Sequence, residues 1–271
     1  MTRMAAVQMV SGADVEKNLA HAATLVAAAA AAGARLVALP ENFAVMPRAE
    51  SERRAAAEAD GRGPIQEFLA RAARTHRVWL VGGTVALTAG APGKLRASCL
   101  LFNDAGERVA RYDKIHLFDA SPDGAERYQE SAGFEAGAEV VVADTPFGRL
   151  GLAVCYDLRF PELFRRLLDR GAEIFAVPSA FTAYTGGAHW ETLVRARAIE
   201  NLAFVIAPDQ GGRHENGRET HGDSMIVGPW GEVLARCGKG AGVAIADCDP
   251  EQLRKARTRL PSIQHRRIKS G

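Results

Sequence analysis

Short apolar segments alternate with helix-forming segments along the first third of the chain, and this alternation restricts the possible folds more than any other feature. The first helix-forming segment has Asp14 as its cap, and Gly33 ends it. The order strand, helix, strand, helix, strand is typical of an α/β sheet with helices packed against it. The predicted strands cover residues 5–10, 35–39 and 78–85, and the predicted helices cover residues 15–32 and 65–74.

Two hairpins are predicted in the rest of the chain, because strand-like segments there flank glycine-containing turns. The turns are Asn103-Asp104-Ala105-Gly106 and Gly228-Pro229-Trp230-Gly231, so the order of elements in the second half resembles that in the first. No change of composition and no Pro/Ser-rich linker divides the chain, and we therefore predict a single domain, residues 1–271, with two mixed sheets. The predicted strands of this part cover residues 98–102, 108–112, 150–154, 174–177, 204–207, 224–227 and 232–236.

The composition argues against several classes of function. The 271 residues carry a formal net charge of +2 with acids and bases interspersed, so we expect neither nucleic-acid nor membrane binding, and a small molecule is the expected partner. The N-terminal segment is too short and polar for a signal peptide, and no apolar run approaches the roughly 20 residues of a membrane span. The four cysteines show no CxxC pair and no zinc spacing with histidine, so no metal is expected and a reducing cytoplasm is the expected location.

Cys155 stands between a predicted strand and a predicted helix. The apolar residues 150–154 precede it, and residues 161–170 have helical spacing with proline in the first turn. Such a junction directs backbone N–H groups and the positive end of the helix dipole toward the sulfur, which favours the thiolate and can stabilise an oxyanion. From the junction alone, a catalytic thiol and a buried, inert cysteine are equally good interpretations.

Two other predicted strands end in charged residues. Glu41 follows the second strand and Lys114 follows the first hairpin, and ligand sites in α/β sheets gather at strand ends. A carboxylate can take the proton of a thiol, and an ammonium can hold the charge that develops on a carbonyl oxygen under attack. Together with Cys155 these groups suffice for acyl transfer, although singly Glu41 could cap the next element and Lys114 could be a solvated lysine.

Three blocks around these residues resemble, in order and separation, the signatures of the nitrilase or carbon–nitrogen hydrolase superfamily. The likeness continues through Ala188-His189-Trp190-Glu191 to His265-Arg266-Arg267 and covers nearly the whole chain. It implies a four-layer α-β-β-α sandwich that forms homodimers or larger assemblies, with the helix at residues 161–170 and the tail near His265 as candidate interface elements. Residues 254–269 form a basic tail, which we expect to be solvated or packed on a partner subunit. The three blocks are Pro40-Glu41-Asn42-Phe43, Lys114-Ile115-His116-Leu117-Phe118 and Cys155-Tyr156-Asp157-Leu158-Arg159-Phe160-Pro161-Glu162.

The resemblance also implies a catalytic mechanism without a metal or organic cofactor. Cys155 would be the nucleophile, Glu41 the general base and later acid, and Lys114 the oxyanion stabiliser together with the backbone N–H of Tyr156. An amide would react through a thioester intermediate and release ammonia.

Members of this superfamily also carry a second active-site glutamate between the lysine and cysteine blocks. Glu130 looks like its counterpart, and Glu126 is a nearby rival. A surface glutamate in a polar loop is the alternative interpretation of Glu130.

The substrate is expected to be an amide, because the Tyr-Asp pair after the nucleophile resembles the amidase branches, whereas nitrilases typically have Trp-Glu there. The block around His189 is similar to that of the deaminated-glutathione amidases and ω-amidases, which act on small amides that bear carboxylates. We therefore expect His189 near the substrate. Asn42 departs from those branches, which often have cysteine there, and Asn42 is a further candidate for substrate contact.

Arg159 is the candidate partner of a substrate carboxylate, through a bidentate contact. Its alternative role is to brace Asp157 or Glu162 inside the fold. An N-carbamoyl amide hydrolase or a nitrilase is an alternative activity in the same superfamily, and a non-catalytic protein that senses or binds through the Cys155 thiol is the alternative of another class.

Overall fold

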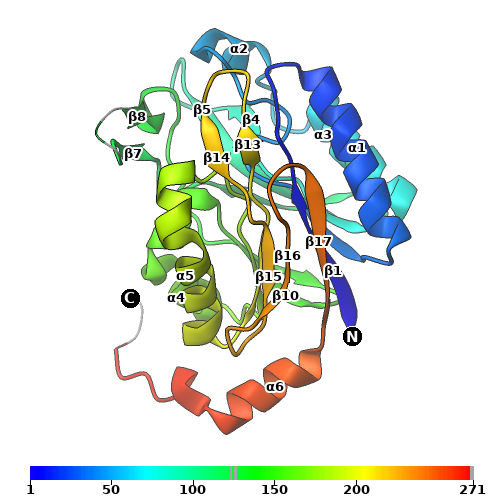
Figure 1. The fold of residues 1–271 in the computed structure, drawn as a ribbon, viewed down its shortest axis with the longest axis vertical. Helices are drawn as coiled ribbons and strands as arrows, with labels where there is room; N and C mark the ends of the chain where they lie inside the picture. The colour runs from blue at the N-terminus through cyan, green and yellow to red at the C-terminus, as the bar shows by residue number, and fades with distance from the viewer. Residues whose placement is uncertain (123, 125–126, 269–271) are drawn as a thin grey trace.

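The computed structural model describes residues 1–122, 124 and 127–268, and two mixed β-sheets lie between two layers of helices (Figure 1). Helices α1 and α3 cover one side, and α4 and α5 cover the other (Figure 1). The expected four-layer α-β-β-α sandwich is thus confirmed. No described helix is long and apolar enough to cross a membrane. The helices are α1 Val15–Ala31, α2 Glu50–Ala55, α3 Pro64–His76, α4 Pro161–Asp169, α5 Ala183–Asn201 and α6 Pro250–Arg259.

The first sheet has three parallel strands, β1, β2 and β3, at its centre. Antiparallel strands extend it on both sides, in the order β17-β1-β2-β3-β5-β4, and β6 also pairs with β5. Since helices cover one face and the other sheet covers the opposite face, the central strands are apolar almost throughout. The strands are β1 Thr2–Gln8, β2 Leu36–Ala38, β3 Trp79–Val81, β4 Val85–Thr88, β5 Leu95–Phe102, β6 Arg108–Asp113 and β17 Gly242–Cys248.

The second sheet repeats this plan. Its parallel strands β10, β11 and β12 have antiparallel neighbours, in the order β16-β15-β12-β11-β10-β9. The two halves therefore resemble each other, as the sequence predicts. The strands are β9 Val142–Thr145, β10 Gly148–Leu152, β11 Ile174–Ala176, β12 Phe204–Ala207, β15 Met225–Val227 and β16 Val233–Arg236, and two short ribbons pair β7 Asp119–Ala120 with β8 Tyr128–Gln129 and β13 Gly211–Arg213 with β14 Glu219–His221.

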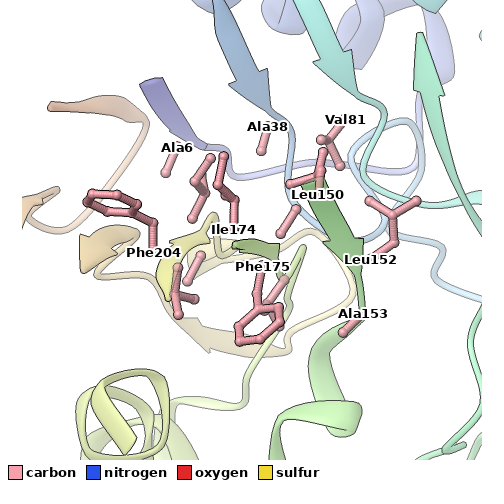
Figure 2. Close-up of a cluster of buried hydrophobic side chains, with 14 of the residues drawn as sticks. Ala6, Ala38, Val81, Leu150, Leu152, Ala153, Ile174, Phe175 and Phe204 are labelled. Atoms are coloured by element: carbon pink, nitrogen blue, oxygen red, sulfur yellow. The ribbon is translucent and has the colours of Figure 1, made fainter. Parts of the chain in front are cut away.

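The main core lies between the two sheets. Ala6 of the first sheet belongs to it together with Leu150 and Ile174 of the second (Figure 2). Val7, the next residue along β1, belongs instead to the core beneath α1, together with Val26. Successive side chains of a strand point to opposite faces, so one continuous apolar strand supplies both cores.

The strand predicted over residues 78–85 is wrong as one element, because β3 ends at Val81 and β4 begins at Val85. Gly83 between them has φ +54°, and a Cβ there would lie 2.1 Å from the backbone oxygen of Pro40. Only glycine permits this close approach. The break therefore brings the β3–β4 connection against Pro40, which follows β2 and directly precedes Glu41.

The basic C-terminal segment begins as helix α6 and is anchored to its own chain. Arg257 Nε donates to the backbone oxygen of Leu202 at 3.0 Å, and its Nη2 donates to that of Ala172 at 3.2 Å. Farther along, Arg266 forms an ion pair with Asp169 at the end of α4. Part of the predicted solvated or partner-bound tail thus packs against the helices and loops of its own protomer.

Candidate active site

A cavity of about 400 Å³ lies where the loops after β2, β6 and β10 meet. This volume is within the roughly 300–1,000 Å³ of small-molecule sites. Within the described part of the chain, no group of three or more His, Cys, Asp or Glu residues is arranged to hold a metal ion. The predicted site residues that line the cavity are Glu41, Asn42, Lys114, Glu130, Cys155, Tyr156 and Arg159.

Cys155 lies at the start of a 3-10 helix, Cys155–Arg159, that separates β10 from α4. The sequence predicts the strand and the helix but not this intervening turn. The φ of Cys155 is +47°, an unfavourable conformation for a residue with a side chain. Its backbone N–H donates to the Pro178 oxygen at 2.9 Å, which holds the strained residue in place at the cavity wall.

Asp157 anchors this turn to the segment that carries Lys114. The Asp157 carboxylate is fully buried and accepts a hydrogen bond of 2.7 Å from the Tyr112 hydroxyl. Its other oxygen lies 2.7 Å from His116 Nδ1 and accepts the His116 backbone N–H at 3.1 Å. Asp157 and His116 both belong to the signature blocks, but no pattern in the sequence indicates this connection between them.

The Lys114 ammonium lies between two carboxylates. Its Nζ is 2.9 Å from Glu41 Oε1 and 3.0 Å and 2.8 Å from the two oxygens of Glu130. Lys114 is 2% exposed and Glu41 5% exposed, so the contact with Glu41 is shielded from water. Glu130 is thus a member of the cluster and not a surface residue, while Glu126 lies outside the described residues.

The cluster determines the charge of each group. Burial raises the pKa of Cys155 well above its usual value, Glu41 raises it further, and Lys114 and the Ala180 N–H only partly oppose this. Burial lowers the pKa of Lys114, but Glu130, Glu41 and Cys155 outweigh burial and raise it well above the ordinary range. The resting site therefore holds a neutral thiol beside a charged ammonium, and a base must remove the thiol proton during the reaction.

Asn42 and Tyr156 flank the cluster. Asn42 has φ +56°, and its backbone N–H donates to Thr84 Oγ1 at 2.9 Å. The Tyr156 ring contacts the Phe118 ring at a centroid distance of 5.0 Å. Both residues line the cavity, as expected for positions next to Glu41 and Cys155.

The Arg159 guanidinium lies 5.2 Å from the centroid of the Phe181 ring and 5.9 Å from that of Tyr156. Its Nη1 is 3.2 Å from His189 Nδ1, and it has no ion pair with any described carboxylate. The alternative in which Arg159 braces Asp157 or Glu162 is therefore wrong. His189, which was predicted to contact the substrate, is exposed and does not line the cavity. Its ring contacts Arg159 instead.

Arg218 also lines the cavity, although it is not among the site residues predicted from the sequence. It lies just before β14 in a glycine-rich loop and belongs to no recognised block, so no local pattern distinguishes it from a solvated arginine. Only the packing of the β13–β14 ribbon brings it to the site.

The carbon–nitrogen hydrolase family model matches residues 3–258. The chain is 44% identical over 265 residues to a Synechocystis protein named deaminated glutathione amidase, and the match covers 97% of each chain.

Solved structures agree with this match. Yeast Nit3, described as a member of branch 10 of the nitrilase superfamily, has a TM-score of 0.88 and 30% identity, covering 98% of this chain and 97% of that one. A mutant of an amidase from Nesterenkonia sp. AN1, solved with acrylamide added to its active-site cysteine, has a TM-score of 0.77 and 26% identity, covering 96% and 98%. This chain thus belongs to the carbon–nitrogen hydrolase family, and it is an enzyme that hydrolyses a carbon–nitrogen bond.

Proposed function

We propose that the enzyme is an amidase in which Cys155 is the nucleophile, Glu41 the general base and Lys114 the oxyanion stabiliser. The observation that carries this proposal is the Lys114 ammonium, held between the Glu41 and Glu130 carboxylates beside a buried thiol. A covalent adduct at the active-site cysteine of the Nesterenkonia amidase supports a nucleophilic thiol in this fold.

In the first half-reaction, Glu41 takes the Cys155 proton as the sulfur attacks the amide carbonyl carbon. The carbonyl oxygen becomes an oxyanion, which the Lys114 ammonium and the Tyr156 backbone N–H stabilise. As the oxyanion collapses, the carbon–nitrogen bond breaks, Glu41 returns the proton to the departing nitrogen, and a thioester remains on Cys155.

In the second half-reaction, Glu41 takes a proton from water as the water oxygen attacks the thioester. The carbon–sulfur bond breaks, Glu41 returns the proton to the departing sulfur, the carboxylic acid leaves, and the thiol is restored. Glu130 has a positioning role, because its two oxygens bind Lys114 Nζ and one of them also accepts the Phe118 backbone N–H at 2.7 Å. This places the ammonium beside the sulfur for both steps.

We further propose that the substrate is a small amide with a carboxylate on its acyl side, as in deaminated glutathione or an ω-amide of an α-keto acid. Arg159 has no described carboxylate partner and faces the cavity beside the nucleophile, which suits a bidentate contact with such a group. Asn42, which also lines the cavity, is a second candidate for substrate contact.

The remaining proposals concern the whole chain. We propose that residues 1–271 act as one catalytic domain, because loops of both sheets contribute to the cluster. We also propose that the enzyme acts in the cytoplasm and that it forms homodimers or larger assemblies. Light scattering at micromolar concentration is the test of assembly, and a monomer would contradict it.

The central test is turnover of a substrate panel by the wild type and by Cys155→Ala. The panel contains deaminated glutathione, α-ketoglutaramate, an N-carbamoyl amino acid, an aliphatic amide and a nitrile. We expect hydrolysis of the carboxylate-bearing amides and a loss of at least roughly a thousandfold in Cys155→Ala.

Cys237→Ala is the matched control, since this half-buried cysteine does not line the cavity. Its activity should equal that of the wild type. Retained turnover in Cys155→Ala would overturn the mechanism, and preference for the carbamoyl compound or the nitrile would move the activity to another branch.

A further inference from the structure

The charge on the cavity wall is incompletely neutralised. Arg53 on the wall is paired with Glu50, with 3.2 Å between Arg53 Nε and Glu50 Oε2. Arg127, Arg159 and Arg218 also line the cavity, and none of them forms an ion pair with a carboxylate of the described residues. Arg127 is exposed, whereas Arg159 and Arg218 are held against aromatic rings and are available to anionic groups of a bound molecule.

Arg218 is held in place without an ion pair, although its charge acts on the buried Asp209 carboxyl. Its Nη2 donates to the Ala180 backbone oxygen at 3.1 Å, and its guanidinium lies 4.9 Å from the centroid of the Tyr128 ring. Its backbone N–H donates to Asn216 Oδ1 at 2.9 Å. Nε has no hydrogen-bond partner among the described residues, but it is buried and out of reach of a ligand. Nη1 also has no such partner and is not buried, so this preorganised guanidinium keeps an unused donor at the cavity, as recognition of a carboxylate requires.

Contacts of residues 180 and 181 relate both arginines to the nucleophile. The Ala180 N–H faces the Cys155 sulfur, and the oxygen of the same residue binds Arg218. The ring of the next residue, Phe181, lies against Arg159. When a carbonyl carbon is bonded to the sulfur, the Arg218 guanidinium therefore lies on the side of Ala180, and the Arg159 guanidinium lies on the side of Phe181.

We propose that Arg218 binds a second carboxylate of the substrate, on the amine side of the scissile amide, and so determines specificity. Arg159 would bind the carboxylate on the acyl side, so the preferred substrate is an amide between an oxo diacid and an amine that itself carries a carboxylate, such as a peptide. This inference rests on the proposed amidase function. A free ω-amide, which lacks the second carboxylate, is the poorer substrate in this scheme.

The test compares deaminated glutathione with the same compound whose glycine carboxylate is replaced by a neutral methylamide. Release of 2-oxoglutarate from each is followed with a coupled dehydrogenase, for the wild type, Arg218→Met and Arg218→Lys. The wild type should prefer the carboxylate form by roughly tenfold or more in kcat/KM, the worth of a charge-assisted hydrogen bond. Arg218→Met should abolish this preference, mainly through KM, and Arg218→Lys should restore part of it.

Arg213→Met is the matched control, because Arg213 is exposed on β13 of the same ribbon and does not line the cavity. It should keep the full preference. Equal turnover of the two compounds by the wild type, or an equal loss on both in Arg218→Met, would overturn the inference while leaving the amidase function standing. Absence of turnover of every amide by the wild type would instead refute the proposed function.

Discussion

At the scale of single residues, the charge states of Cys155, Lys114 and its two carboxylate partners decide the chemistry of the cavity. Burial alone would favour a neutral thiol and a neutral amine. The two carboxylates that contact Lys114 outweigh the effect of burial on its pKa, so the amine stays protonated. The negative charge of Glu41 acts on Cys155 in the same direction as burial and favours the neutral thiol. The resting site thus holds Cys155 as a neutral thiol and Lys114 as a charged ammonium, the states from which the proposed mechanism starts.

The raised pKa of Cys155 predicts a specific pH dependence in the enzyme without substrate. The rate of alkylation by iodoacetamide should still rise from pH 7 to ~10, because the thiolate fraction remains small above the usual cysteine pKa of about 8.5. Glu41→Gln removes a negative charge that raises this pKa, so alkylation at about pH 8 should become faster while amide hydrolysis is lost. A plateau near neutral pH, or slower alkylation in Glu41→Gln, would contradict these assignments.

At the scale of elements, the 3-10 helix Cys155–Arg159 connects the chemistry to the fold. Asp157 binds this helix to the segment after β6, through Tyr112 and His116. The His116 ring stacks on the Phe160 ring at a centroid distance of 3.7 Å, which adds a second contact between the two segments. The relative placement of Cys155 and Lys114 thus depends on the buried Asp157 carboxylate together with this ring stack.

Asp157→Asn should weaken this connection, because an amide nitrogen would face donors that now meet a carboxylate oxygen. We expect kcat to fall roughly 10- to 100-fold with little change in KM, and the free energy of unfolding to fall by about 1–3 kcal/mol. Steady-state kinetics and urea denaturation measure the two effects. Asp144→Asn, at an exposed position on β9, should change neither, and unchanged kcat in Asp157→Asn would show that this network does not position the nucleophile.

At the scale of the whole molecule, the cluster forms where the two halves of the chain meet. Gln210, just after the strand β12 Phe204–Ala207, donates to the Glu41 backbone oxygen at 3.0 Å and to Ser11 Oγ at 2.9 Å. It also accepts the Ser11 N–H at 3.1 Å. A buried residue of the second half therefore supports the proposed base, which belongs to the first half.

Gln210→Leu should disturb stability and catalysis together. It removes the partner of the Ser11 backbone N–H and of the Glu41 backbone oxygen, so we expect the free energy of unfolding to fall by about 2–4 kcal/mol and kcat to decrease. The exposed Gln264→Leu is the control and should alter stability by less than about 0.5 kcal/mol. Normal activity in Gln210→Leu would indicate that Glu41 needs no support from the second half.

The local elements were largely predictable, because they depend on patterns within a few residues of one another. Asp14 begins α1 as a side-chain cap, with its carboxylate accepting the Lys17 N–H at 3.1 Å, and Gly33 follows the helix with φ +87°. The strand predicted over residues 78–85 failed because only the approach of Gly83 to Pro40 reveals the break. Strand β17 was missed, and its partner β1 lies at the other end of the chain.

The sequence by itself determined the alternating order of elements, the chain positions of Glu41, Lys114 and Cys155 at their ends, and the family that those blocks resemble. Period, caps, turns and motifs are short-range properties that a single sequence displays. Only the tertiary structure decided that Glu130 binds Lys114, that Asp157 connects two catalytic segments and that Arg218 faces the cavity. Those contacts join segments through packing of two sheets, and long-range packing leaves no periodic signal in the residues that it brings together.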